Sequence, residues 1–136
     1  IGGGIGHLAQ TLNNQYLLNV KSLDMDPKLQ ATGSKRQERN FKRPENQVQY
    51  FTVKVEEDAP SLHEHLGPTT LSLGLHTCGN LANDQIKASA KHKSSIINFG
   101  CCYYKVGKNQ NLSSFAKNSP DRLDFSLYAL TLGTRA

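Results

Sequence analysis

Several features that would place a chain in a membrane or in the secretory pathway are missing from this sequence. It contains no tryptophan, and aromatic residues make up only 7% of its 136 residues. No apolar run approaches the roughly 20 residues that a membrane-spanning helix needs, and no signal-peptide pattern is visible. The three cysteines, Cys78, Cys101 and Cys102, are odd in number, which argues against a framework of disulfides. We therefore expect a cytoplasmic protein with no membrane contact.

Positive charge exceeds negative charge. The 16 Lys and Arg against 11 Asp and Glu give a formal net charge of +5, and basic residues are concentrated in residues 35–43 and 91–93. A basic surface would suit RNA or another anionic partner, although a solvated helix face gives the same pattern. Charge alone therefore leaves the function open.

Helix and strand signals alternate along the chain. Asp26 followed by Pro27 is typical of a helix N-terminus, and Ser119 followed by Pro120 predicts another. Segments rich in β-branched and aromatic residues predict strands. We expect helices at 6–17, 26–41, 60–66, 82–93 and 119–132, and strands at 18–24, 48–55, 70–76 and 95–101.

This alternation predicts an α/β fold, with a doubly wound, mostly parallel sheet, in a single domain over residues 1–136. A glycine-rich turn normally follows a buried strand, and no strand segment stands before the turn that opens this sequence. We therefore expect a fragment of a longer chain in which the first strand of the sheet is missing.

The opening sequence IGGGIGHLAQ predicts a loop that binds a cofactor. A glycine loop that enters a helix leaves unpaired backbone N–H groups for a ligand. Residues 4–9, GIGHLA, satisfy the dinucleotide pattern G-x-G-x-x-A, whereas residues 2–6, GGGIG, satisfy G-x-G-x-G. Asp24 follows at a spacing typical of an acid that accepts ribose hydroxyl groups. The loop alone leaves both cofactor classes open.

Ligands of open α/β sheets bind at the carboxyl ends of the strands, and unusual residues gather at those ends here. Asp24 ends the second strand, and Met25 after it would pack on a purine or in the core. Asp58 and Ala59 follow the third strand; they resemble an acid and amide that read an adenine edge, or form a solvated turn. The next two strands are followed by HTCG (76–79) and CCYY (101–104).

Two of these later motifs resemble a known family. GLHTCGNLANDQIK (74–87) and INFGCCYYK (97–105) are similar to stretches of the methyltransferase-like protein 25 type family. IGGGIGHLAQTL and LDMDPKLQATGSKRQERN look like the opening region of the same family. The resemblance implies a class I methyltransferase with a Rossmann-like fold that uses S-adenosylmethionine. Tyr104 departs from the pattern, because relatives often carry histidine there.

The resemblance also implies roles for the matching residues. The glycine loop would line the methionine portion of the cofactor, and Asp24 would hold its ribose. The floor near the methyl group would be formed by His76, Cys78, Gly79 and Asn80, and the opposite wall by Cys101, Cys102 and Tyr103. With the residues named above, the cofactor-binding set is Gly2, Gly4, Gly6, Asp24, Met25, Asp58, Ala59 and His76, and the catalytic set is His76, Cys78 and Tyr103.

The chemistry of these side chains leaves alternatives open. His76, with an ordinary pKa of about 6.5, suits a general base and equally suits a residue that organises its loop. Cys78 suggests a nucleophile, but cysteine more often packs as a small hydrophobe. On an extended strand, Cys101 and Cys102 would point in opposite directions. The segments HTC and CC lack the two-residue gaps of common zinc loops, so we expect no metal.

We therefore expect an S-adenosylmethionine-dependent methyltransferase that acts on an unidentified acceptor, with RNA the first candidate and protein the second. An NAD(P)-dependent oxidoreductase is the alternative, but its Tyr-x-x-x-Lys pair would have to be Tyr104 and Lys108, on an apparent loop. A non-catalytic binding module with the same fold is a third interpretation. The oligomeric state is left open.

Overall fold

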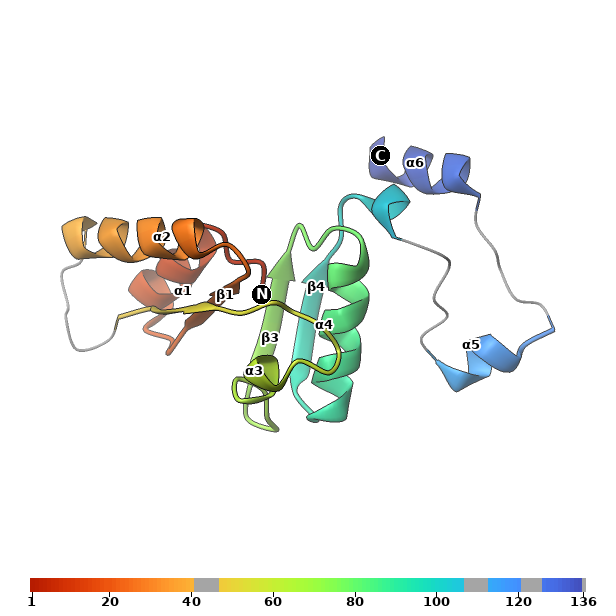
Figure 1. Ribbon diagram of the computed structural model, residues 1–136, viewed down its shortest axis with the longest axis horizontal. Helices are drawn as coiled ribbons and strands as arrows, with labels where there is room; N and C mark the ends of the chain where they lie inside the picture. The colour runs from red at the N-terminus through yellow and green to blue at the C-terminus, as the bar shows by residue number, and fades with distance from the viewer. Residues whose placement is uncertain (41–46, 107–112, 121–125, 136) are drawn as a thin grey trace.

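Strands and helices alternate through most of the chain (Figure 1). The computed structural model describes residues 1–40, 47–106, 113–120 and 126–135. In chain order the elements are α1 (His7–Tyr16), β1 (Lys21–Asp24), α2 (Pro27–Asn40), β2 (Gln49–Thr52), α3 (Pro60–His63), β3 (Leu71–Leu75), α4 (Asn80–Lys91), β4 (Ser95–Phe99), the 3₁₀ helix η2 (Tyr103–Lys105), α5 (Ser114–Asn118) and α6 (Leu127–Arg135).

The four strands form two parallel pairs. β1 pairs with β2, with Lys21 opposite Gln49, and β3 pairs with β4, with Leu71 opposite Ser95. Helix α2 packs against the first pair and α4 against the second. Each pair is thus joined through a helix, as parallel strands require. The predicted α/β class with parallel strands is confirmed.

Residues at the start of the chain hydrogen-bond to both strand pairs. The backbone nitrogen of Ile1 donates to the carbonyl of Leu73 in β3 at 2.8 Å, and that of Gly3 donates to Leu23 in β1 at 3.0 Å. Figure 1 shows the N-terminus lying between β1 and β3. Backbone hydrogen bonds from these residues therefore link the two strand pairs.

The predicted start of α2 is confirmed in detail. Asp26 Oδ1 accepts hydrogen bonds from the backbone N–H groups of Lys28 at 2.8 Å and Leu29 at 3.4 Å. Pro27 occupies the first helical position, where its missing N–H costs nothing. Asp26 thus caps the N-terminus of α2.

The prediction of one helix over 119–132 is wrong. Ser119 follows the short helix α5, with an extended backbone at φ −71° and ψ 132°, because the proline after it disfavours helical geometry there. Ser126 instead accepts a hydrogen bond from Ala129 N at the start of α6. The cap of α5, Ser113, accepts from Ala116 N at 3.0 Å and is the signal that the sequence analysis missed. Residues 121–125 of the predicted helix lie outside the described part of the chain.

A small apolar cluster holds β1, the segment after β2 and α3 against α4. Its buried members come from four separate segments of the chain and are Leu23, Val53, Val55, Leu62 and Ala88. Leu62 and Ala88 are fully buried. The apolar interior is therefore modest, and buried polar side chains share the packing.

Hydrogen bonds of buried amide side chains also hold helices against strands. Gln85, in α4, is fully buried; its Nε2 donates to Ser72 Oγ in β3 at 2.9 Å, and its Oε1 accepts from Asn98 Nδ2 in β4 at 2.6 Å. Asn98 also donates to Thr77 Oγ1 at 2.8 Å. Gln85 thus ties α4 to both β3 and β4.

None of the helices in the described part of the chain has both the length and the apolar character that crossing a membrane requires.

The amide network predicts a stability effect of a single substitution. Gln85→Leu preserves volume but leaves Ser72 Oγ without the hydrogen bond that Gln85 donates and deprives Asn98 of one acceptor. We expect a loss of about 2 to 3 kcal/mol in the free energy of unfolding, measured by urea denaturation. The control Ala90→Leu, at an exposed position of the same helix, should change it by less than about 0.5 kcal/mol. Equal effects of the two leucines would show that the network does not stabilise the fold.

Candidate functional site

The glycine loop adopts the backbone geometry that its sequence spacing predicts. Gly2, Gly4 and Gly6 have φ of 63°, 53° and 77°, a left-handed region that residues with a Cβ occupy only at a cost. These are the three positions of the G-x-G-x-G pattern. The loop is closed by a hydrogen bond from Gly6 N to the Gly3 carbonyl at 2.9 Å, and α1 begins directly after it.

Close packing is a second reason for glycine at two positions of the loop, Gly3 and Gly6. A Cβ at Gly3 would overlap Ser22 Oγ, and a Cβ at Gly6 would lie 2.5 Å from the hydroxyl oxygen of Tyr50. Gln10 Nε2 donates to the hydroxyl of Tyr50 at 2.7 Å and so fixes the ring in place. Burial raises the pKa of the Tyr50 hydroxyl. A Cβ at Gly4, by contrast, would meet nothing within 4 Å. The loop therefore has an open side at Gly4 and a packed side at Gly6.

Asp24 joins the end of β1 to this loop. Its Oδ2 accepts from Gly4 N at 2.8 Å and its Oδ1 accepts from Asp26 N at 3.0 Å. The carboxylate is half-buried and lies against the open side of the loop. Each oxygen keeps acceptor capacity for a further donor. Asp24 therefore contacts the glycine loop directly, and its predicted role in holding a ribose stays a prediction.

Sequence reasoning missed Gln30, which supports the same loop from α2. Its Nε2 donates to the carbonyl of Gly4 at 2.9 Å, and the side chain is only 4% exposed. Both backbone polar groups of Gly4 are thus hydrogen-bonded, the N–H to Asp24 and the C=O to Gln30. A buried glutamine on a helix face is the signal that could have pointed to this role.

Met25 projects into solvent beside the carboxylate of Asp24. It is 67% exposed, so it is not part of the core. An exposed methionine at the end of a strand leaves a flexible apolar side chain free to cover a flat ring. The interpretation of Met25 as ordinary core is excluded.

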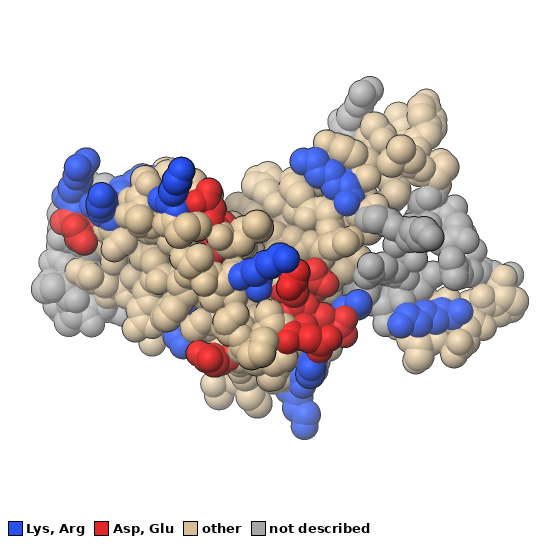
Figure 2. Space-filling view, in the orientation of Figure 1, with Lys and Arg blue, Asp and Glu red and all other residues tan. Residues whose placement is uncertain are grey.

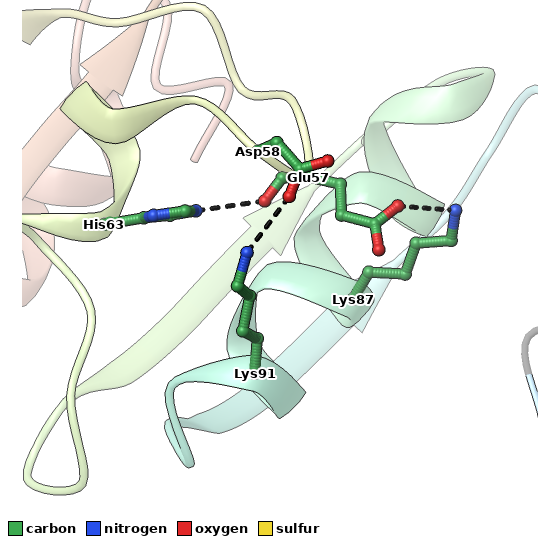
Figure 3. A network of polar contacts seen from close by, with 5 residues as sticks. All are labelled: Glu57, Asp58, His63, Lys87 and Lys91. Carbon is green, nitrogen blue, oxygen red and sulfur yellow. Dashed lines mark hydrogen bonds and ion pairs between the residues drawn. The ribbon is translucent and has the colours of Figure 1, made fainter.

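The acidic segment after β2 is held by lysines of α4. Glu57 pairs with Lys87 at 2.9 Å, and Asp58 pairs with Lys91 at 3.0 Å, as Figure 3 shows. The hydrogen bond from Lys91 holds the pKa of the Asp58 carboxyl below its usual value. His63 Nε2 lies 3.0 Å from the backbone carbonyl of Glu57. Asp58 thus has a partner on α4, and its reading of an adenine edge stays a prediction.

Ala59 has a structural position of its own. It is the residue before α3, and its carbonyl accepts from the backbone nitrogens of Leu62 at 3.0 Å and His63 at 3.3 Å. Its own backbone nitrogen donates to Glu56 at 3.1 Å. The amide of Ala59 is therefore engaged within the turn that it closes, and its predicted contact with a cofactor also stays a prediction.

His76 stands directly after β3 in a strained conformation. Its φ is 59°, a left-handed geometry that costs a residue with a Cβ about 1 to 2 kcal/mol. Its backbone nitrogen donates to the carbonyl of Phe99 at 2.9 Å, which continues the β3–β4 pairing into the turn. The imidazole is exposed. The histidine therefore both shapes the turn and presents a ring to solvent.

The three cysteines meet at the ends of β3 and β4. Cys78 Sγ lies 3.1 Å from Cys101 Sγ, and Cys101 Sγ lies 3.6 Å from Cys102 Sγ. The expectation that Cys101 and Cys102 point in opposite directions is wrong, because β4 ends at Phe99 and the strand alternation stops before them. The thiols share hydrogen bonds that lower the pKa of Cys78 and raise that of Cys101 to about 12.

Tyr103 and Tyr104 begin the 3₁₀ helix that follows the cysteines. They are 45% and 40% exposed, so neither is a core residue. Lys105 Nζ lies 5.8 Å from the centre of the Tyr104 ring. Tyr104 is thus accessible at the end of β4. Lys108, its proposed partner in an oxidoreductase, lies outside the described residues.

Charge is unevenly distributed over the face in view. Figure 2 shows acidic side chains gathered near the centre of the molecule with basic ones among them, and further basic side chains at the end that carries α2. In the centre, Lys54, Lys87 and Lys91 pair with the three consecutive acids 56–58. The basic residues of α2, Lys28, Lys35, Arg36 and Arg39, are outside this network.

Comparison with known proteins gives one match. The model of a family described as a methyltransferase domain matches residues 1–109, which include the glycine loop, the HTCG segment and the three cysteines. No match was found among curated proteins, and none was found among solved structures. The expectation that one domain extends over residues 1–136 stays a prediction.

The loop geometry predicts an order of stability among alanine variants. Gly4→Ala introduces left-handed strain alone and should cost about 1 to 2 kcal/mol. Gly6→Ala adds overlap with Tyr50 and should cost about 3 kcal/mol or more. Gly67→Ala, with nothing within 4 Å of its Cβ, is the control and should change stability by less than about 0.5 kcal/mol. Urea denaturation would contradict this account if Gly6→Ala were no costlier than Gly67→Ala.

Proposed function

Because the chain belongs to the family defined by this methyltransferase domain, we propose that it binds S-adenosylmethionine at the glycine loop and transfers the methyl group to an acceptor at the HTCG and CCYY segments. When bound, S-adenosylmethionine supplies an electrophilic methyl group on a sulfonium. The protein's own part is to hold that group, orient the acceptor and accept a proton.

One observation carries the cofactor proposal. The Asp24 carboxylate lies against the glycine loop, 2.8 Å from Gly4 N, where a Cβ at Gly4 would meet only open space. A ribose needs a carboxylate to accept from its hydroxyls, and a charged methionine portion needs a backbone that it can approach closely. The residues of this site therefore fit the group. Exposed Met25 beside Asp24 supports a contact with the purine.

The acceptor side rests on residues that two strands bring together. His76 and Cys78 follow β3, Tyr103 follows β4, and the 3.1 Å contact between Cys78 and Cys101 joins the two segments. The exposed imidazole of His76 is free to take a proton from an acceptor. Tyr103, 45% exposed, offers a ring on which an acceptor base would stack. Their meeting at one edge also supports the narrower resemblance to the methyltransferase-like protein 25 type family.

RNA is the acceptor class that we propose first. The net charge is +5, and α2 carries four basic residues outside the ion-paired network around residues 56–58. Lys and Arg side chains attract the phosphate groups of nucleic acids, and the counterions released from the phosphates favour binding. Protein is the second candidate, and cytoplasm is the compartment that fits reduced cysteines. Incubation with methyl-labelled S-adenosylmethionine and cell extract, followed by ribonuclease or protease, would distinguish the two acceptors.

The cofactor proposal predicts a selective loss of binding. Titration calorimetry should show binding of S-adenosylhomocysteine and none of NADH. Asp24→Ala should weaken that binding at least about tenfold, since hydrogen bonds to a charged group contribute about 1.5 to 3 kcal/mol. Asp26→Asn is the matched control, because asparagine retains the α2 cap, and it should leave affinity within about twofold.

Three results would contradict this account. Binding of NADH alone would favour the oxidoreductase. Binding of neither ligand to a folded sample would favour a non-catalytic binding module. Equal weakening by both aspartate substitutions would show that Asp24 acts through the fold rather than through the cofactor.

A further inference from the structure

The cysteine cluster has a property that methyl transfer does not require. The Sγ atoms of Cys78, Cys101 and Cys102 all lie within 4.8 Å of one another, and no other group of three or more potential ligands is that close in the described part of the chain. All three cysteines are free and half-buried. They come from two separate turns, so the grouping is a product of the fold.

The distances fit metal coordination better than a disulfide. A tetrahedral Zn²⁺ with Zn–S bonds of about 2.3 Å places its sulfur ligands about 3.8 Å apart, whereas bonded disulfide sulfurs are about 2.05 Å apart. The observed separations are 3.1 Å and 3.6 Å. Shifts of well under about 1 Å in these two separations would reach the spacing of a bound metal.

The backbone around the cluster is arranged for this approach. β3 and β4 are adjacent parallel strands, so the turns after them meet at one edge. Gly79, with φ of 61°, lets the carbonyl of Lys105 come so close that a Cβ would lie 3.0 Å from it. The spacings within HTC and CC are poor zinc signals because HTC supplies a single thiol and the two thiols of CC are adjacent, without the gap of common zinc loops. The pairing of β3 with β4 supplies the third ligand.

We propose that Cys78, Cys101 and Cys102 form a three-thiolate site for Zn²⁺, with the fourth position open to solvent or to an exogenous ligand. Thiolates are soft ligands that favour zinc over magnesium or calcium. Three thiolates and one Zn²⁺ would carry a net charge of −1. Binding releases the thiol protons, so affinity rises with pH. This site replaces the expectation of no metal that spacing suggested.

The test uses Co²⁺ as a spectroscopic probe of the full protein, reduced and kept free of oxygen. We expect one equivalent to bind with thiolate-to-cobalt absorption in the near ultraviolet and tetrahedral bands in the visible, both lost when Zn²⁺ is added. Cys78→Ser, Cys101→Ser and Cys102→Ser should each lower affinity at least about tenfold. His76→Ala is the control, since the imidazole is the nearest alternative ligand in sequence, and it should leave affinity within about twofold.

Several results would overturn the proposal. Absence of charge-transfer absorption in the reduced protein would do so, as would a disulfide between two of the cysteines that persists under mild reductant. Loss of binding in His76→Ala would show that the imidazole is the fourth ligand, so that no coordination position is open. Circular dichroism of each serine variant separates loss of a ligand from loss of the fold; a folded variant that keeps full affinity contradicts a three-thiolate site.

The same samples separate this proposal from the cofactor proposal. S-adenosylhomocysteine is titrated into the metal-free and the zinc-loaded protein. Metal binding without S-adenosylhomocysteine binding would support the zinc site and contradict the proposed function, and the reverse result would overturn only the zinc site.

Discussion

The arrangement of the whole site depends on a glycine loop that runs between two pairs of strands. Ile1 bonds to β3 and Gly3 bonds to β1, so the loop fixes the two halves of the fold relative to each other. It comes so close to β1 that a side chain at Gly3 would overlap buried Ser22. Asp24 accepts from the N–H of Gly4, and Gln30 donates to its C=O. The same constraint that builds the fold therefore leaves backbone exposed to a ligand.

Buried glutamines position helices over these strands. Gln37 of α2 bonds to both backbone groups of Val48, and Gln85 of α4 bonds to Ser72 and Asn98. Amide side chains offer donors and acceptors together, so they satisfy backbone groups at the ends of short strands that no further strand pairs with. This directional bonding sets helix position more narrowly than apolar contact, which does not depend on direction. The short strands of this fold are thus compatible with a defined site.

Local signals in the sequence predicted the order of elements and the cap at Asp26, because each depends on a few neighbouring residues. The end of β4 at Phe99 was not predictable, since residues 95–101 have strand composition throughout. That single boundary decides where Cys101 and Cys102 point. The role of Gln30 and the meeting of the cysteines depend on contacts between distant segments, which spacing along the chain does not encode. The ion pair of Asp58 with Lys91 of α4 is another contact between distant segments, so spacing did not predict it either.

The polar interior has a consequence for how this fold responds to temperature. Unfolding exposes apolar surface, which raises heat capacity, and polar surface, which lowers it. Within the part of the chain that the structure describes, nine buried polar residues accompany seven buried hydrophobic ones, so the two contributions offset each other more than in a purely apolar core. The free energy of unfolding therefore curves less with temperature than in a typical domain of this length. Its margin of stability therefore changes less for each degree of warming or cooling away from the temperature of maximum stability.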